Sequence, residues 1–291
     1  MPRKPRLHVP GGLYHVILRG NGRQAIFFDD EDRHRWEALL AEGLGRYGHR
    51  VHAYCWMTNH IHMAVQCRVE PVSKLMRFVA SLYSRSTNRK MNRSGHLFER
   101  RHRLVLVQAD GYLQALVRYI HHNPVRAGLV DDLSAYRWSS HRAYLGRTRP
   151  DWLTTDWVLS MFGDSAVISR RRYCKFVQQS DDVMIPAFKV GGQTDNRILG
   201  DDEFANSVAA EIHDRQIPDN LDEIIMRFCV KYDITEEELR SKSRLRRNAR
   251  IRAEITLAAI EANTATLATM ARRFKRSESV LSRSMARLRT N

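Results

Sequence analysis

The stretch YCWMTNHIHMAV, residues 54–65, predicts two short strands joined by a Met-Thr-Asn turn. Hydrophobic periodicity and turn residues also predict the elements on either side of this stretch. The expected strands are 13–19, 51–56, 60–66 and 104–107, and the expected helices are 32–47, 72–91 and 110–122. This order of elements indicates an α+β domain with an antiparallel sheet and helices on one face.

The histidine pair His60 and His62 is the first indication of a functional site. Residues two apart on a strand face the same way, so the two imidazoles share one face while Ile61 points into the core. Two imidazoles a strand pleat apart suit one divalent metal ion. The pair alone leaves other interpretations open, namely two surface histidines or the H-x-H of cupin-like metal enzymes.

The helix predicted at 110–122, within GYLQALVRYIHHNPVRAGLV, is the second indication. Tyr119 lies at the edge of its apolar stripe and can point toward the sheet. Asn123 comes one turn later on nearly the same face, so a phenol and an amide are presented side by side. The other interpretation is an ordinary tyrosine at the edge of the core, followed by an asparagine that ends the helix.

Charge is distributed along the chain in blocks. The chain has 48 Lys and Arg against 32 Asp and Glu, a formal net charge of +16. Residues 1–150 hold 25 basic and 11 acidic residues, residues 191–239 hold 4 and 13, and residues 240–291 hold 14 and 3. Arginine matches phosphate oxygens, so two basic blocks predict two regions that contact nucleic acid. A generally basic surface is the alternative.

Other features of the composition exclude several classes of protein. No apolar run approaches the length of a membrane span, and MPRKPRLHVPGG at the N-terminus lacks the apolar segment of a secretory signal. The four cysteines show no close pairing, which indicates reduced thiols and argues against a zinc ribbon or a disulfide framework. We therefore expect a cytoplasmic protein.

Several motifs in a fixed order resemble the REP-associated tyrosine transposases of the HUH single-tyrosine nuclease superfamily. The motifs are YHVILRGNGRQAIFFDDEDR, YCWMTNHIHMAV, GHLFERR, YIHHNPVRAGLV and YRWSSHRAY. The resemblance covers residues 8–150 and implies a ferredoxin-like or RRM-like sheet with the histidines on a central strand. By position, it implies that His60, His62 and Asn123 bind a metal ion and that Tyr119 is the nucleophile.

The resemblance also implies an activity. The chain would be a DNA transposase and site-specific endonuclease that cleaves and rejoins hairpin-bearing, REP-type single-stranded DNA through a 5′-phosphotyrosine intermediate. A free phenol, with a pKa of about 10, is a poor nucleophile at neutral pH, and a divalent metal ion on the phosphate helps the attack. Two histidine nitrogens and one amide oxygen leave positions open for phosphate oxygens, which suits Mg²⁺ or Mn²⁺.

Further basic and polar positions are candidates for DNA contacts, with a solvated basic surface as the alternative. They are Arg19, Asn21, Arg23, Arg100, Arg101 and Arg126 in the first domain, and Ser277 and Arg283 near the C-terminus. The helix at 72–91, which carries Lys74, Arg77, Arg85, Arg89 and Lys90, is expected to line a groove for the DNA backbone. His121 and His122 are expected to be solvated or to contact DNA.

The C-terminal block, residues 240–291, predicts three further helices. They are 245–261, 266–274 and 278–288, with Ser277 as the expected cap of the last. Two helices joined by a short turn are typical of a helix-turn-helix, and the block resembles the DnaA C-terminal DNA-binding domain. Phe274-Lys275-Arg276 stands where a small turn residue is usual. A basic helical bundle packed on the first domain is the alternative.

These observations give a domain plan and a set of hypotheses. Residues 1–150 would form the HUH nuclease domain, 151–195 a connecting segment with a GGQT linker at 191–194, and 196–291 an all-α, DnaA-like helix-turn-helix domain. We expect a monomer or homodimer in the bacterial cytoplasm, associated with the nucleoid, that binds single-stranded hairpins and also duplex DNA through its C-terminal domain. A non-catalytic, sequence-specific DNA-binding regulator and a relaxase or replication initiator are the competing functions.

Overall fold

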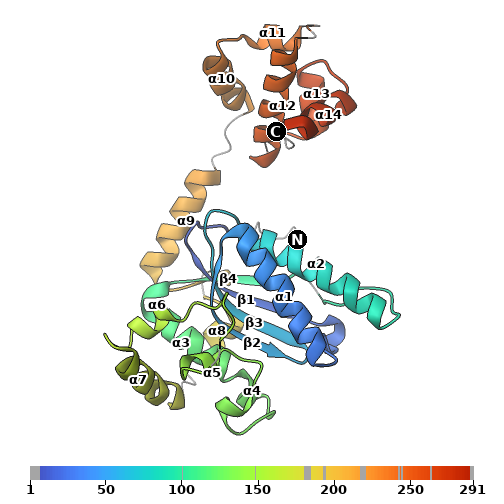
Figure 1. Cartoon of the computed structure of the whole chain (residues 1–291). Coiled ribbons are helices and arrows are strands. Elements are labelled where there is room, and N and C mark those ends of the chain that lie inside the picture. Colours follow the sequence, from blue (N-terminus) through green and yellow to red (C-terminus); the bar gives the residue numbers. More distant parts are fainter. Residues whose placement is uncertain are drawn as a thin grey trace. The chain divides into compact units, whose positions relative to one another are not determined.

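The computed structural model divides into two compact units, Met1–Val208 and Ala209–Asn291. We call them the N-terminal and C-terminal units and describe each by itself (Figure 1). The division falls within α9 (Asp202–Gln216). The residues that the structure describes are 7–99, 101–147, 149–179, 185–192, 195–216, 221–241, 243, 245–262 and 264–288.

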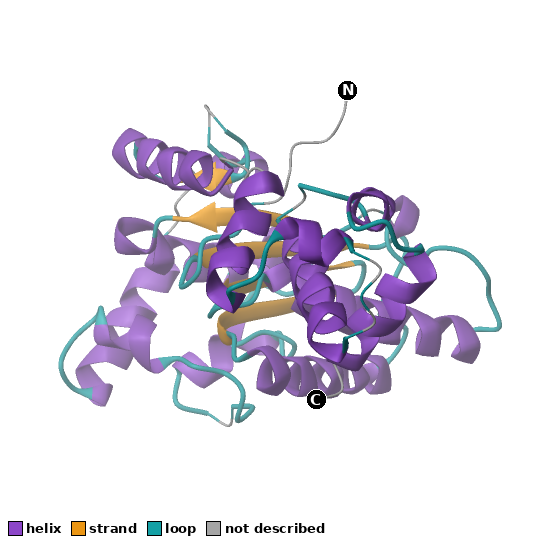
Figure 2. Ribbon diagram, turned by 90° about the horizontal axis from the view of Figure 1, so that it is seen from above, coloured by secondary structure: helices purple, strands orange, loops and turns teal. Residues whose placement is uncertain are grey.

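The N-terminal unit begins with a βαββαβ arrangement. Its elements are β1 (Leu13–Arg19), α1 (Asp30–Tyr47), β2 (Arg50–Met57), β3 (His60–Gln66), α2 (Val72–Lys90) and β4 (Arg103–Val107). These four strands pair antiparallel in the order β2-β3-β1-β4 and lie side by side in Figure 2. This is the ferredoxin-like topology. The expected α+β fold is confirmed, and each predicted element ends within two residues of the observed one.

The strand register places both histidines on one face of the sheet. Ile17 of β1 pairs with His62 of β3, and Arg19 pairs with His60. Paired residues on neighbouring strands point to the same face, so these four side chains share one side. Ile61 lies between the histidines and is fully buried on the other side. The orientation predicted for the pair is therefore confirmed.

Helices cover both faces of the sheet. On one face, Trp36 of α1 contacts Trp56 of β2, with the ring centroids 6.1 Å apart. On the histidine face lies α3 (Ala109–His121), on the opposite side of the sheet from α1 and α2 (Figure 1). The expectation of helices on one face is correct for α1 and α2 and wrong for α3. The histidine face also carries buried apolar side chains such as Val105. A helix packed on this face removes them from water, which is favourable.

Two glycines in α1 allow a matched test of how closely α1 packs on α2. A Cβ at Gly43 would lie 2.5 Å from Leu75 Cδ1 and 3.2 Å from Phe78 Cδ1, whereas a Cβ at Gly45 would meet nothing within 4 Å. We expect Gly43→Val to lower the free energy of unfolding by about 1–3 kcal/mol through overpacking. Gly45→Val should change it by less than about 0.5 kcal/mol. Denaturant titration of both variants measures the difference, and equal effects would contradict this account of the interface.

Residues 123–199 continue the N-terminal unit. Their elements are α4 (Asn123–Arg126), α5 (His141–Tyr144), α6 (Asp156–Ser160), α7 (Ala166–Gln178), α8 (Ile185–Val190) and β5 (Ile198–Leu199), and short 3-10 turns lie at Asn21–Arg23 and Leu133–Ala135. Buried side chains from this region, including Val158, Tyr173 and Phe188, join the core between the sheet and α3. β5 extends the sheet by pairing in parallel with β4.

The segment 151–195, expected to connect two domains, is therefore part of the N-terminal core. The glycines of the expected linker are held in a turn, because Gly191 N donates to the Ala187 carbonyl and Gly192 N to the Ile198 carbonyl. Gln193 and Thr194 lie outside the described residues. The physical reason is that apolar side chains of α6, α7 and α8 are buried in the same core as those of α3 and the sheet.

The C-terminal unit is a helical bundle. Its helices are α10 (Leu221–Tyr232), α11 (Glu236–Arg240), α12 (Arg246–Glu261), α13 (Leu267–Arg273) and α14 (Glu278–Leu288). Ile255, Phe274 and Leu281 contribute to its buried core. The three helices predicted in this block are confirmed to within one residue at each end. Lys275, in the turn before α14, adopts a left-handed φ of 51°, the conformation that a glycine usually supplies.

The structure also describes the state of the cysteines and the character of the helices. All four cysteines are free thiols, and Cys55 and Cys67 are buried. Within the described residues, none of the helices combines the length and apolar character that crossing a membrane requires.

Candidate active site

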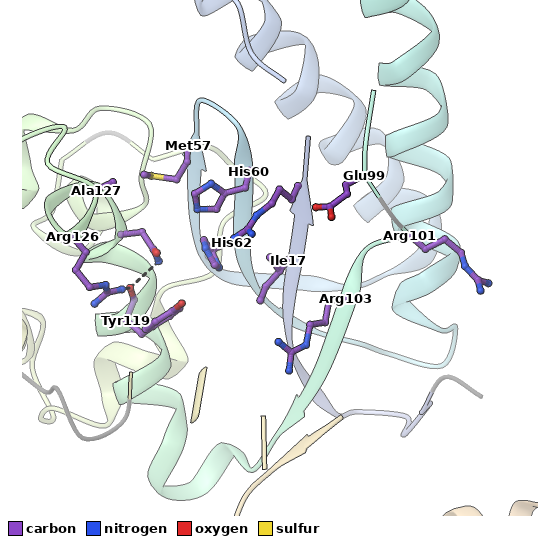
Figure 3. A pocket seen from close by; sticks show the side chains of 12 residues that line it. Ile17, Met57, His60, His62, Glu99, Arg101, Arg103, Tyr119, Arg126 and Ala127 are labelled. Carbon is purple, nitrogen blue, oxygen red and sulfur yellow. Dashed lines mark hydrogen bonds between the residues drawn. The ribbon is translucent and has the colours of Figure 1, made fainter. Parts of the chain in front are cut away.

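A pocket of about 520 Å³ opens on the histidine face of the sheet, opposite the C-terminal end of α3 (Figure 3). Its lining residues come from all four antiparallel strands, from α3 and α4, and from the segment before β4. They are Ile17, Arg19, Met57, His60, His62, Glu99, Arg101, Arg103, Tyr119, Asn123, Arg126 and Ala127. The four residues predicted to act in catalysis or metal binding thus line one pocket.

Each histidine is oriented through its Nδ1 atom. His60 Nδ1 lies 2.6 Å from Asn59 Oδ1, and His62 Nδ1 lies 2.9 Å from His15 Nε2. The His60 and His62 ring centroids are 5.0 Å apart. In the part of the chain that the structure describes, no hydrogen bond involves Nε2 of His60 or His62. Both Nε2 atoms are therefore available as metal ligands.

Burial keeps these imidazoles neutral. It lowers the pKa of His60 to about 4 and holds the pKa of His62 well below its ordinary value. Burial also lowers the pKa of His15 to about 3. Histidine binds metal ions as the neutral imidazole, so both rings of the pair are already in the form that a ligand requires. The contact of His62 with His15 fixes the ring, as outer-shell partners of metal-binding histidines commonly do.

Tyr119 faces the histidines from α3. The residue is 5 % exposed, and its ring meets the His62 ring at an angle of 85°, with the centroids 5.7 Å apart. Phe188 of α8 packs on it at a centroid distance of 5.1 Å. We predicted a position at the edge of the apolar stripe, and the structure adds that Tyr119 is buried by a segment far along the chain.

Three arginines surround the phenol. Burial raises the pKa of Tyr119 above its ordinary value, although Arg126, Arg103 and Arg19 each act to lower it. Arg126 lies over the ring, with Cζ 4.4 Å from the centroid, and also donates to the Tyr119 carbonyl. The phenol is therefore protonated at neutral pH, but its surroundings favour negative charge once a proton leaves.

Asn123 begins α4, one turn after Tyr119. Its Nδ2 atom donates to the carbonyls of Tyr119 and Ile120, at 3.0 and 3.3 Å. These bonds use only the amide nitrogen, so Oδ1 is available as a ligand. The described residues contain no cluster of three His, Cys, Asp or Glu side chains that could hold a metal ion. A metal ion here would therefore be bound by two imidazoles and an amide oxygen, a mixed and open set that suits Mg²⁺ or Mn²⁺.

The residues predicted to contact DNA are found in several places. Arg19, Arg101 and Arg126 line the pocket, whereas Asn21 and Arg23 lie on the exposed 3-10 turn after β1 and are not among its lining residues. Arg100 lies outside the described residues. The other two belong to the C-terminal unit, and both Ser277 and Arg283 are exposed there.

Sequence reasoning missed three residues that shape the site. Apart from Glu99, which was a weaker candidate, they are His15, Arg103 and Phe188. His15 and Arg103 could have been identified from the sequence. Each lies two positions along its strand from a buried core residue, Leu13 for His15 and Val105 for Arg103, and therefore points to the same face of the sheet. Phe188 carried no such signal, since only the packing of α8 brings it to Tyr119.

His121 is not solvated and His122 is half-buried and bonded within the protein, which corrects our expectation. His121 is fully buried and lies 2.8 Å from the Tyr173 hydroxyl and 2.7 Å from Ser140 Oγ. His122 Nε2 lies 2.6 Å from the Val177 carbonyl. Both rings fix the end of α3 to the segments that follow it, because Tyr173 and Val177 belong to α7 and Ser140 precedes α5.

The sequence that forms this pocket matches a known family. Residues 8–123 match the IS200-like transposases. The resemblance of these residues to a transposase family is thereby confirmed. A solved structure described as "Structure of the REP associates tyrosine transposase bound to a REP hairpin" is 16% identical, covers 54% of this chain and 91% of that chain, and has a TM-score of 0.45. A comparison with curated proteins gave no match.

Proposed function

We propose that the N-terminal unit is a metal-dependent DNA strand transferase that uses Tyr119 as its nucleophile. The observation that carries the proposal is the convergence of Tyr119, His60, His62 and Asn123 on one pocket. These residues come from β3, α3 and α4, and three arginines act on the phenol in the same place. A phenol, two neutral imidazoles and several cations suit an attack on a phosphodiester.

The proposed step is a transfer of the phosphodiester from DNA to protein. Tyr119 Oη forms a bond to phosphorus, and the bond from phosphorus to the 3′ oxygen breaks. The phenol gives up one proton and the departing oxygen takes one up, which leaves a 5′-phosphotyrosine and a free 3′ hydroxyl. Attack by a 3′ hydroxyl in the reverse sense rejoins DNA without ATP. Arg126, Arg103 and Arg19 stabilise negative charge on the phenol and the phosphate.

The metal ligands in this proposal are Nε2 of His60, Nε2 of His62 and Oδ1 of Asn123. A bound Mg²⁺ or Mn²⁺ would polarise the scissile phosphate and orient it toward the phenol. The protein contributes the fixed orientation of its ligands. His15 and Asn59 hold the two rings, and the bonds from Asn123 Nδ2 to α3 carbonyls hold the amide.

The substrate in this proposal is single-stranded DNA that carries a REP-type hairpin. The order of motifs across residues 8–150 supports this substrate. Association of the protein with the bacterial nucleoid would follow from it.

The decisive experiment detects the covalent intermediate. The full chain is mixed with labelled single-stranded hairpin oligonucleotides in Mn²⁺ or Mg²⁺ and, in parallel, with EDTA. We expect a protein–DNA adduct that resists denaturing detergent, forms only with metal, and maps by mass spectrometry to the peptide that contains Tyr119. DNA binding without an adduct under any of these conditions would instead favour a non-catalytic DNA-binding regulator.

We also propose that the C-terminal unit binds duplex DNA through α14. The turn after α13 is closed by Lys275 in a left-handed conformation, which gives the short connection that a helix-turn-helix needs. Ser277 and Arg283 are exposed. Val280, which lies between them in the sequence, is 39 % exposed. A helix with polar, basic and apolar groups on one free face suits contacts in a major groove.

Replacing Arg283 by alanine should weaken duplex binding by about 10-fold if its side chain contacts DNA. Arg250→Ala is the matched control, because it removes the same charge from an exposed arginine of α12 that already pairs with Glu254 at 2.8 Å. Binding to a labelled duplex is measured for both variants at constant salt. Equal losses would mean that only net charge matters and would exclude α14 as the specific contact.

A further inference from the structure

A second pocket adjoins the active-site pocket. It has a volume of about 460 Å³ and lies between α2 and the segment 95–101. Glu99 and Arg101 line both pockets, so the two pockets meet at these residues. Arg101 points away from the histidine pair and Tyr119 (Figure 3). We call the part lined by Ser81, Ser84, residues 95–98 and Arg101 the α2 groove.

The wall of the α2 groove is held in place by the sheet and by α2. The Glu99 amide donates to the Arg19 carbonyl at 3.0 Å, and the Asn21 amide donates to the Leu97 carbonyl at 2.9 Å. On the other side, Asn88 of α2 donates from Nδ2 to the Gly95 carbonyl at 2.9 Å. The groove is therefore a preformed feature, built on the same strand end that supplies Arg19 to the active site.

An aromatic ring lies in this wall. Phe98 is half-buried and lines the α2 groove. Its ring packs against Trp36 and Tyr83, with both centroid distances 6.4 Å. An aromatic ring that packs on other rings within the protein and also lines a pocket is a suitable stacking surface for an unpaired base.

The cations of α2 fall into two groups. Lys74 pairs with Glu70 at 2.6 Å, and Lys90 pairs with Asp29 and Asp32. Arg77, Arg85 and Arg89, by contrast, are exposed and have no ion pair among the described residues. Spaced at i, i+4 and i+8, Arg77, Ser81 and Arg85 follow one side of the helix, and Ser81 lines the groove. Two guanidinium groups that are available to phosphates therefore flank it.

We infer that the α2 groove carries a single strand of DNA to or from the active site. An unpaired base would stack on Phe98, while Arg77, Arg85 and Arg101 would bind the neighbouring phosphates. A single strand is favoured over a duplex because stacking on Phe98 requires a base whose face is exposed. The direction of the strand toward Tyr119 rests on the proposed function, whereas strand binding itself does not.

The first test compares cations on the same helix. Binding of the full chain to a (dT)₂₀ oligonucleotide is measured in EDTA over a range of salt concentrations. For single strands, each phosphate that the protein neutralises adds about 0.7 to the slope of log K against log salt. We expect Arg77→Ala and Arg85→Ala each to reduce the slope by about 0.7, and Lys74→Ala to leave it unchanged. Equal effects of all three substitutions, or none, would overturn the inference.

The second test locates the strand on the protein. (dT)₂₀ is crosslinked to the full chain by ultraviolet light in EDTA, and the attached peptides are identified by mass spectrometry. Crosslinks to the tryptic peptide SGHLFER, residues 94–100, are expected, and their yield should fall in the double variant Arg77→Ala/Arg85→Ala. Crosslinks confined to the C-terminal unit would overturn the inference.

These binding tests need neither metal nor the Tyr119 hydroxyl. A chain that formed no covalent adduct but crosslinked through residues 94–100 would retain the α2 groove and lose the proposed chemistry. A chain that formed the covalent adduct without these crosslinks would support the proposed chemistry and overturn the α2 groove as a strand-binding site.

Discussion

Tyr119→Phe is expected to abolish the covalent protein–DNA adduct, with a loss of at least about 10³-fold in the rate of strand cleavage. The substitution removes only the hydroxyl that forms the bond to phosphorus. The ring that remains can still pack on Phe188 and under the Arg126 guanidinium. Folding and DNA binding should therefore be retained, and the adduct assay in Mn²⁺ measures the loss.

Tyr112→Phe provides the matched control for this substitution. Tyr112 lies on the same helix, is half-buried, and does not line the active-site pocket. Its variant should form the adduct at the wild-type rate. An adduct of normal yield in Tyr119→Phe would show that another group attacks the phosphate and would remove the basis of the proposed chemistry.

His62→Ala should cause the second largest loss of cleavage, and His15→Leu a smaller and different one. Loss of the His62 imidazole removes a metal ligand, so added Mn²⁺ should not restore the rate. Among the proposed metal ligands, His15 contacts His62, at 2.9 Å, and its ring also packs edge-on against Tyr119 with the centroids 5.5 Å apart. Removing such an outer-shell partner typically weakens metal affinity by about 10- to 100-fold. We therefore expect His15→Leu to shift the Mn²⁺ titration to higher concentration and to approach the wild-type rate at saturation.

The control for these two variants is His34→Ala, which changes a largely exposed histidine of α1. It should leave the Mn²⁺ titration unchanged. Thermal unfolding of all three variants identifies any loss that comes from instability, since His15 and His62 are both buried. Recovery of His62→Ala by excess Mn²⁺, or a saturating rate of His15→Leu as low as that of His62→Ala, would contradict the assigned roles.

The local pattern of the sequence was sufficient for most elements around the site. The alternation in HIHMAVQ put His60 and His62 on one face, and the apolar stripe of GYLQALVRYI put Tyr119 at its edge. Such patterns depend on neighbours two to four residues away, which is the range over which strands and helices set side-chain direction. Asn123 follows Tyr119 by one helical turn, so its proximity to Tyr119 could also be predicted from the sequence alone.

Contacts made by His121 could not be predicted in the same way. A histidine beside another histidine and before Asn-Pro reads as polar and solvated, yet the ring is buried against Tyr173 and Ser140. Its environment depends on α7, which lies about fifty residues later in the chain. No pattern within the helix specifies which segment will pack on its outer side.

The sequence by itself determined the βαββαβ order, the shared face of His60 and His62, and the placement of Tyr119 one turn before Asn123. Only the tertiary structure decided that α3 covers the histidine face and that Arg103 and Phe188 reach the phenol. It also brought His15 to Nδ1 of His62 and the helices α6, α7 and α8 into the core. Side-chain direction follows from short-range backbone geometry, whereas strand register and helix packing depend on burying apolar surface between segments far apart in the chain.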